Sequence, residues 1–416
     1  MQTPEKRLLS NTIYLYIMQI SGYIFPLLTF PYLTRILGPD KYGVVIFSNA
    51  VMVYFQILVD FGFILSATNV CSIHREDKNK LAHVTFGIIQ AKILLAFLGA
   101  IILFFCSTFV PILQNNKTFL WLSYISVLLS IFLPDYLFRS IEQMSIITYR
   151  VLLSRLVYTG LIFMLVRTDN DFIRVPLALI GGNIIAITLT WYEIVRKLHI
   201  LPVRVSIKET LQYLHDSSVF FLSHVAVSMY QSLNIVVLGF QFSSANIAQY
   251  GAANTLISSG RSLLTPISNS IYPYMVAQKN YKLVKKIVLI FEPIIFLMCV
   301  CLFIFAESFI VFIAGDQYID SVPIFRAMLP LIVISLPTYL FGYPVLGALQ
   351  KINVANISVI IGAIFHIIGL LLLFFIGYIT FISVALLTFA TECIVFTIRF
   401  YYVMLELRKA KNYEDF

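Results

Sequence analysis

The chain has 416 residues, of which 60% are hydrophobic and 12% are charged, and its formal net charge at pH 7 is +9. A soluble domain carries about 25% charged residues, so this composition excludes a water-soluble globular protein. Apolar runs long enough to cross a bilayer recur along the whole sequence, and they predict an all-α integral membrane protein.

We predict twelve transmembrane helices. In chain order they cover residues 11–36, 42–68, 81–109, 117–138, 145–166, 173–196, 210–238, 246–275, 283–313, 322–346, 352–376 and 379–406. A helix rises about 1.5 Å per residue, so the longest spans exceed the bilayer core and are expected to tilt or kink. Pro26 and Pro31 in the first span, and Pro330 and Pro337 in the tenth, mark expected kinks.

The basic residues predict the orientation of these helices. If both termini are cytoplasmic, nineteen of the 29 lysines and arginines lie on the cytoplasmic side. Five lie on the opposite side, namely Arg35, Lys41, Lys117, Arg167 and Arg174. Cytoplasmic loops carry an excess of Lys and Arg, so we expect both termini in the cytoplasm. The basic loops then face anionic lipid head groups, and no nucleic-acid partner is expected.

Two short motifs occur twice, about half a chain length apart. "LGPDKYG" at 37–43 is echoed by "LGFQFSSANIAQYG" at 238–251, and "LPDYLF" at 133–138 by "LPTYLF" at 336–341. Each half then holds six spans, which predicts two six-helix lobes related by a pseudo-two-fold axis along the membrane normal. We expect an N-terminal lobe at 1–209, including a basic linker at 197–209, and a C-terminal lobe at 210–416. Transporters of this kind place their site between the halves.

Polar residues inside the spans are candidate site residues, because a buried charge costs roughly 2.5–3.5 kcal/mol on insertion scales. Three spans carry polar stripes at helical spacing. The stripes are Asn49, Gln56 and Asp60 in the second span, His224, Gln231 and Asn234 in the seventh, and Asn254, Ser258 and Arg261 in the eighth.

We expect these faces to line a hydrophilic substrate cavity in which Arg261 contacts an anionic group. The alternative is that Arg261 and Asp60 pair with neighbouring side chains and only hold helices together. Lys92 is expected to extend its ammonium towards the cytoplasm, with a role in the cavity as the alternative.

Three charges lie near the cytoplasmic end of the fourth span, and two titratable groups lie deeper in the second half. Asp135, Arg139 and Glu142 are candidate entry-gate or anchoring groups. Glu292 and His366 are candidates for coupling transport to an ion gradient. No phosphate-binding loop, catalytic constellation or metal-binding spacing is present in the sequence, so we expect no cofactor, no metal and no enzymatic activity.

Several motifs resemble those of the bacterial polysaccharide flippases, within the MATE-like multidrug/oligosaccharidyl-lipid/polysaccharide exporter superfamily. They are "FPLLTFPYLTRILGPDKYGVVIFSNAV", "DFGFILSAT", "LFRSIEQMSIIT", "SIYPYM" and "AGDQYIDSVPIF", in this order along the chain. The resemblance implies a two-lobe fold, alternating access and a basic cavity formed chiefly by helices 1, 2, 7 and 8. The chain departs from the family at Asn69, where an arginine is common, and at Arg139-Ser140, where Gln-Gly is common.

The resemblance implies a flippase for undecaprenyl-diphosphate-linked oligosaccharides that serve O-antigen, capsule or related surface polysaccharides. It implies a monomer in the inner membrane of a bacterium, surrounded by membrane lipids and working with polysaccharide polymerase or export partners. Two alternatives remain at this point: a small-molecule or drug exporter of the same fold, and a membrane enzyme of polysaccharide assembly.

Overall fold

The computed structural model describes the backbone of residues 4–109 and 111–414, and the side chains of residues 10–109, 113–221 and 232–408. The described residues form helices and connecting turns and contain no strand. The chain divides into two compact units, Met1–Ala245 and Asn246–Phe416. The predicted lobes, 1–209 and 210–416, were defined from the repeated motifs in the sequence. The division into these lobes stays a prediction.

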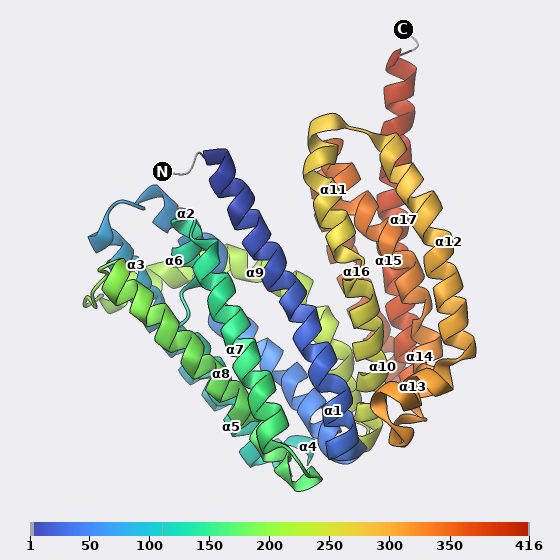
Figure 1. Cartoon of the computed structure of the whole chain (residues 1–416), viewed down its shortest axis with the longest axis horizontal. Helices are drawn as coiled ribbons and strands as arrows, with labels where there is room; N and C mark the ends of the chain where they lie inside the picture. Colours follow the sequence, from blue (N-terminus) through green and yellow to red (C-terminus); the bar gives the residue numbers. More distant parts are fainter. Residues whose placement is uncertain (1–3, 110, 415–416) are drawn as a thin grey trace. The chain divides into compact units, whose positions relative to one another are not determined.

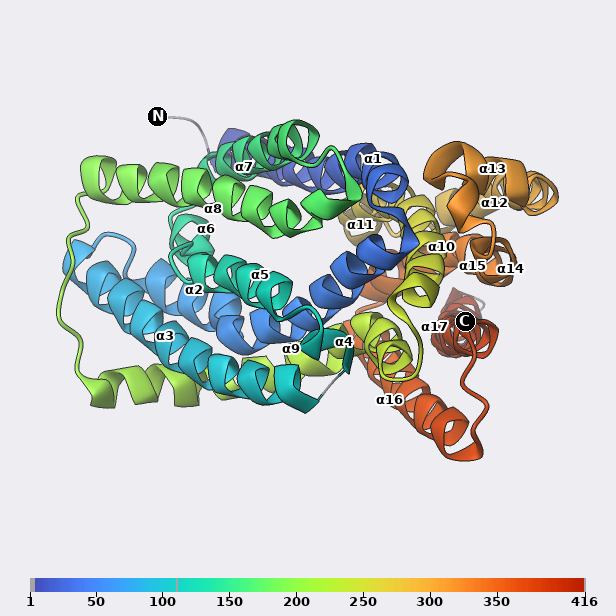
Figure 2. The same ribbon diagram turned by 90° about the horizontal axis from the view of Figure 1, so that it is seen from below.

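The first unit contains nine α-helices and two short helical turns up to α9 (Figure 1). They are α1 (Pro4–Asp60), α2 (Phe63–Ile73), α3 (Lys78–Phe109), α4 (Pro111–Gln114), α5 (Lys117–Ser130), α6 (Asp135–Ser140), α7 (Met144–Leu165), η1 (Asp169–Ile173), α8 (Arg174–Tyr192), η2 (Glu193–Lys197) and α9 (Ile207–Gly239). Helices α7 and α8 pack side by side, α3 packs on α9, and α5 lies between these two pairs (Figure 2).

The second unit begins within α10 (Ser244–Ser262). The helices that follow are α11 (Thr265–Gln278), α12 (Tyr281–Ile304), α13 (Ala306–Ala314), η3 (Asp316–Tyr318), α14 (Ser321–Met328), α15 (Pro330–Leu340), η4 (Phe341–Leu346), α16 (Ile352–Ile376) and α17 (Phe381–Glu414). Arg399 of α17 donates hydrogen bonds to the carbonyl oxygens of Thr338 and Ala355, at 2.8 and 3.3 Å, and so ties α17 to α15 and α16.

Within the described residues, nine helical segments are long and apolar enough to cross a membrane. The chain is therefore an all-helical, multi-pass membrane protein, but this count does not confirm twelve spans. The first segment, Ser10–Ile73, has 64 residues and covers two predicted spans. The predicted spans 210–238 and 246–275 are not among the nine. Side chains 222–231 of α9 lie outside the described residues, and α10 and α11 are separate helices.

The first two predicted spans are joined by a single residue with non-helical geometry. Gly38 has φ 64° and ψ 174°, and Pro39 follows it. Glycine adopts this positive φ without steric strain, and proline has no N–H to continue the helical hydrogen bonds. The chain therefore turns within "LGPD" without the loop that the sequence predicts between 36 and 42.

The second predicted span, 42–68, is not continuous as expected. The helix stops at Asp60, and Phe61 and Gly62 have φ values of 40° and 74°. A Cβ atom on Gly62 would lie 2.8 Å from the Cβ atom of Phe220 and the backbone N of Phe221, so α9 packs directly on this break. The Phe61 ring stacks on that of Phe221 with ring centroids 4.4 Å apart. Broken helices are tolerated at membrane depth where they line a cavity.

Candidate functional site

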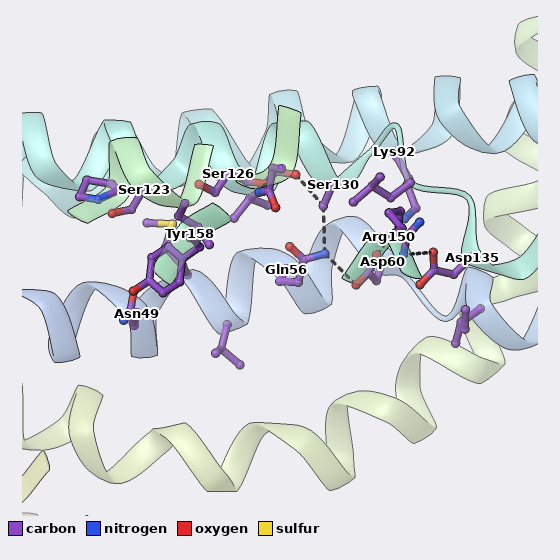
Figure 3. A pocket seen from close by; sticks show the side chains of 18 of the residues that line it. Asn49, Gln56, Asp60, Lys92, Ser123, Ser126, Ser130, Asp135, Arg150 and Tyr158 are labelled. Carbon is purple, nitrogen blue, oxygen red and sulfur yellow. Dashed lines mark hydrogen bonds and ion pairs between the residues drawn. The ribbon is translucent and has the colours of Figure 1, made fainter. Parts of the chain in front are cut away.

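The first unit contains a half-open cavity of about 710 Å³ (Figure 3). Helices α1, α2, α3, α5, α6, α7 and α8 all contribute lining residues. A volume of this size is within the range of about 300–1,000 Å³ that is typical of ligand pockets. The cavity is therefore large enough to hold part of a substrate.

One predicted stripe lines this cavity. Asn49, Gln56 and Asp60 are spaced by seven and four residues on α1, and all three are lining residues, with Val53 between them. Residues at these spacings share one helix face. Asp60 is the last residue of α1, at the break before Phe61 and Gly62.

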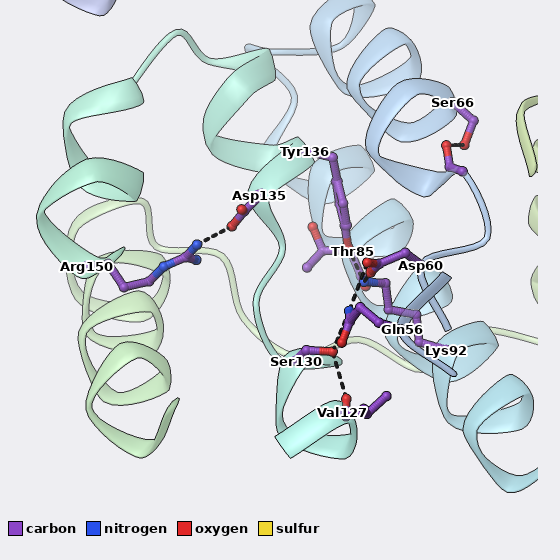
Figure 4. Close-up of polar contacts among 11 residues, drawn as sticks. Gln56, Asp60, Ser66, Thr85, Lys92, Val127, Ser130, Asp135, Tyr136 and Arg150 are labelled. Carbon is purple, nitrogen blue, oxygen red and sulfur yellow. Dashed lines mark hydrogen bonds and ion pairs between the residues drawn. The ribbon is translucent and has the colours of Figure 1, made fainter. Parts of the chain in front are cut away.

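Asp60 is held in a network at one end of the cavity (Figure 4). Lys92 of α3 places its Nζ atom 2.8 Å from Asp60 Oδ1. Gln56 Nε2 donates to Asp60 Oδ2 at 2.8 Å and to Ser130 Oγ at 3.0 Å. Ser130 in turn donates to the carbonyl oxygen of Val127. The network joins α1, α3 and α5 at the point where α1 ends.

A second ion pair lines the same cavity. Arg150 Nη2 of α7 is 2.6 Å from Asp135 Oδ1 of α6, and both residues line the cavity. Arg150 Nη1 makes only a long contact of 3.4 Å with Thr190 Oγ1, and its Nε atom is buried without a hydrogen-bond partner among the described residues. Asp135 follows Pro134, where the break between α5 and α6 ends. Both carboxylates therefore stand at helix breaks.

The two ion pairs are asymmetric in exposure. The Lys92 and Arg150 side chains are 6% and 4% exposed, whereas those of Asp60 and Asp135 are 42% and 29% exposed. The cations are fixed by packing, and their carboxylates face the cavity. Each buried cation is therefore compensated by a carboxylate that is more exposed than the cation itself.

Arg261 lies in the second unit. Its Nη2 atom is 2.6 Å from Glu392 Oε1, and its Nε atom donates to Ser335 Oγ at 2.8 Å. The Arg261 and Glu392 side chains are 20% and 10% exposed. These contacts join α10, α15 and α17 and agree with the alternative in which Arg261 pairs with its neighbours. The predicted contact of Arg261 with a substrate anion stays a prediction.

We expect this pair to determine the stability of the second unit. Glu392→Gln should lower the melting temperature strongly, because removing one partner of a buried ion pair costs about 3–5 kcal/mol. The double variant Arg261→Met with Glu392→Met should recover most of that loss, since it leaves no unpaired charge. Thermal unfolding of the purified protein in detergent measures both effects. A double variant less stable than Glu392→Gln would contradict this account.

The remaining predicted residues are dispersed. Arg139 and Glu142, grouped with Asp135 in the sequence, are not among the residues that line the cavity. Asn234 is buried, Asn254 is half-buried and Ser258 is exposed, and none of them lines this cavity. The side chains of His224 and Gln231 lie outside the described residues.

The two candidate coupling residues have different surroundings. Glu292 lines a second, mainly apolar cavity of about 500 Å³ between α12, α15 and α17, and its Oε2 atom is buried without a hydrogen-bond partner among the described residues. His366 is fully buried, and its Nδ1 atom lies 2.9 Å from Thr391 Oγ1. Thr391 donates its hydroxyl hydrogen to the carbonyl of Leu387, so we infer that His366 Nδ1 carries the proton of this contact.

Sequence reasoning missed Arg150 as a cavity residue and favoured the other position for Lys92. The Lys92 side chain is buried, lines the cavity and pairs with Asp60, in agreement with the alternative. Arg150 was counted among the cytoplasmic charges, yet it is 4% exposed in the cavity wall. The signal available in the sequence was the position of each cation inside an apolar span, and a cation there needs a carboxylate partner.

Comparisons with known proteins agree on one group of transporters. Two bacterial proteins that carry the name "Putative O-antigen transporter" are similar in sequence. The protein from Escherichia coli K12 is 29% identical over 97% of this chain and 98% of its own length. The protein from Shigella dysenteriae is 25% identical over 67% of this chain and 69% of its own length.

Solved structures show the same fold. The lipid II flippase MurJ in an inward closed conformation matches with a TM-score of 0.72 at 15% identity, over 95% of this chain and 87% of MurJ. An inward-facing multidrug MATE transporter of the MOP superfamily matches with a TM-score of 0.67 at 13% identity, over 96% of this chain and 99% of the transporter. The fold is therefore MATE-like and MurJ-like.

The sequence profile of a family described as "Polysaccharide biosynthesis protein" matches residues 8–279, which is well over half of the chain. The chain belongs to the polysaccharide biosynthesis protein family.

Proposed function

We propose that this protein is a flippase that moves polyprenyl-diphosphate-linked oligosaccharide repeat units across the bacterial cytoplasmic membrane by alternating access. The family match, the two similar proteins named as O-antigen transporters and the MATE- and MurJ-like fold support this function. The observation that carries the mechanism is the cavity with two buried cations, Lys92 and Arg150.

The physical task is to carry a polar head group through hydrocarbon. Each sugar hydroxyl costs roughly 4–8 kcal/mol to transfer from water into pure hydrocarbon, and a diphosphate costs more, so unassisted flipping is negligible. A cavity with polar walls removes most of this cost, while the polyprenyl tail stays in the lipid. We place the diphosphate at Lys92 and Arg150, where it replaces the carboxylates of Asp60 and Asp135.

Lys92 and Arg150 are better candidates for the anion site than Arg261. Both line a cavity of substrate size, and Arg150 has an N–H group that no described residue satisfies. Arg261 lines neither of the two cavities described above and is held by Glu392 and Ser335.

The basic loops favour an orientation with both termini in the cytoplasm. We propose that the chain forms two six-helix lobes and acts as a monomer. We also propose that it works beside a polysaccharide polymerase or export partner.

Loss of the gene tests the function directly. We expect a deletion strain to lose surface polysaccharide and to accumulate oligosaccharide-diphosphate lipid that stays inaccessible from outside the membrane. Plasmid-borne protein should restore both. A deletion strain with normal surface polysaccharide and increased sensitivity to drugs would reject the flippase and favour the small-molecule exporter.

We further propose that Glu292 couples transport to a proton gradient, because this residue lines a cavity and its Oε2 atom is buried without a hydrogen-bond partner among the described residues. Glu292→Gln should make flipping in reconstituted vesicles insensitive to an imposed proton gradient. His366→Gln is the matched control, since His366 already has Thr391 as a partner and should keep the response. An unchanged gradient response in Glu292→Gln would exclude this carboxyl.

A further inference from the structure

The cavity in the first unit has two chemically different ends (Figure 3). The charged end contains Asp60, Lys92, Asp135 and Arg150, which are all the charged residues of the lining. The neutral end contains hydroxyl and amide side chains, namely Asn49, Ser123, Ser126 and Tyr158. Asn49 precedes Asp60 by eleven residues on α1, which separates these two residues by about 16 Å at 1.5 Å per residue. Ser126 lies between them, one helical turn before Ser130 on α5 (Figure 3).

One hydroxyl group of the neutral end lacks a partner. Ser126 is 7% exposed, and its Oγ atom is buried without a hydrogen-bond partner among the described residues. Buried polar side chains normally have partners, because an unsatisfied group pays its full desolvation cost. Ser123 donates its hydroxyl hydrogen to the carbonyl of Phe119 at 2.8 Å and keeps its acceptor sites. The neutral end thus offers a set of donors and acceptors that a ligand can satisfy.

We infer that the neutral end binds an uncharged sugar residue of the oligosaccharide while the diphosphate occupies the charged end. A sugar ring presents hydroxyl groups that both donate and accept, which matches the serine, amide and phenol groups. Its C–H faces can pack on the ring of Tyr158, which also lines the cavity. The lining has no charged residue at this end, so a sugar carboxylate would be buried without a counterion there.

The inference rests on the proposed function, and it adds selectivity to it. The charged end recognises the diphosphate common to all polyprenyl-linked substrates, whereas the neutral end distinguishes sugars. A hydroxyl-binding site discriminates well, because a wrong group leaves its buried polar atoms unpaired. We therefore expect Asn49, Ser126 and Tyr158 to make the protein bind uncharged oligosaccharides more tightly than acidic ones.

The test uses the purified full-length protein in lipid nanodiscs and three probes: polyprenyl diphosphate without sugar, the same lipid with an uncharged trisaccharide, and the same lipid with a uronic-acid trisaccharide. The wild-type protein should bind the uncharged trisaccharide lipid at least tenfold more tightly than the sugar-free lipid, and the acidic one no more tightly than the sugar-free lipid.

The double variant Asn49→Ala with Ser126→Ala should bind the uncharged trisaccharide lipid only as well as the sugar-free lipid. Its affinity for the sugar-free lipid should equal that of the wild type, which also shows that the variant is folded. Ser107→Ala, a buried serine outside the cavity lining, is the matched control and should change neither affinity.

Two results would overturn the inference while leaving the function intact: a double variant that binds the uncharged trisaccharide lipid like the wild type, or one that loses affinity for all three probes alike. A wild-type protein that binds none of the lipids would reject the proposed function and this inference together.

Discussion

Lys92→Met is expected to stop export of lipid-linked oligosaccharide. The substitution keeps an unbranched apolar stem that is one atom shorter but removes one of the two cations at the charged end of the cavity. A hydrogen bond to a charged group contributes about 1.5–3 kcal/mol, so affinity for polyprenyl diphosphate should fall roughly 10- to 100-fold. The protein should still fold, because Asp60 is 42% exposed and retains its hydrogen bond from Gln56.

Two variants control this experiment. Lys92→Arg keeps the charge and should retain much of the export. Arg155→Met removes another cation from the same unit, one that donates to Ser21 and to the carbonyl of Met18 and does not line the cavity. It should lower stability without changing the affinity for polyprenyl diphosphate. Normal export by Lys92→Met at normal protein levels would show that the anion binds elsewhere.

The local features of the site follow from the sequence. The stripe of Asn49, Gln56 and Asp60 was predictable because the spacing of residues on one helix fixes their common face. The membrane class follows from composition in the same way. The interruption between the first two predicted spans was also located correctly, although only Gly38 departs from helical geometry there.

The partners of these residues could not be predicted, because they come from distant parts of the chain. Lys92 is 32 residues from Asp60, and Glu392 is 131 residues from Arg261. A single sequence contains no information about which of several intramembrane charges meet. Only the general rule that such charges occur in pairs was available, and it does not name the pairs.

The helix breaks were missed for a different reason. Phe61 and Gly62 lie inside a continuous apolar run, and hydropathy does not distinguish a helix from a break in such a run. The structure shows that the breaks place Asp60 and Asp135 at the cavity, so these interruptions of the predicted spans position the candidate site. The glycine in "DFG" and the proline in "LPD" were the available signals.

Asp60→Asn is expected to have opposite effects on binding and on export. In the empty cavity Asp60 neutralises Lys92, and an arriving diphosphate must displace it. Without this competitor, polyprenyl diphosphate should bind up to about tenfold more tightly, because one ion-pair partner no longer opposes it. Export should nevertheless slow, since the carboxylate that returns to Lys92 also helps to release the diphosphate.

Thermal unfolding distinguishes this role from a purely structural one. Without ligand, Asp60→Asn leaves Lys92 buried and unpaired, which should lower stability by up to about 3–5 kcal/mol. Polyprenyl diphosphate should restore the stability, giving a larger ligand-induced shift in melting temperature than in the wild type. Glu392→Gln likewise leaves Arg261 without its carboxylate partner, at a position outside the cavity. Polyprenyl diphosphate should not restore the stability of this variant. Asp60→Asn can instead weaken the binding of sugar-free polyprenyl diphosphate. In that case Asp60 contributes to the substrate site directly, and the proposal that the diphosphate replaces the Asp60 carboxylate at Lys92 is wrong.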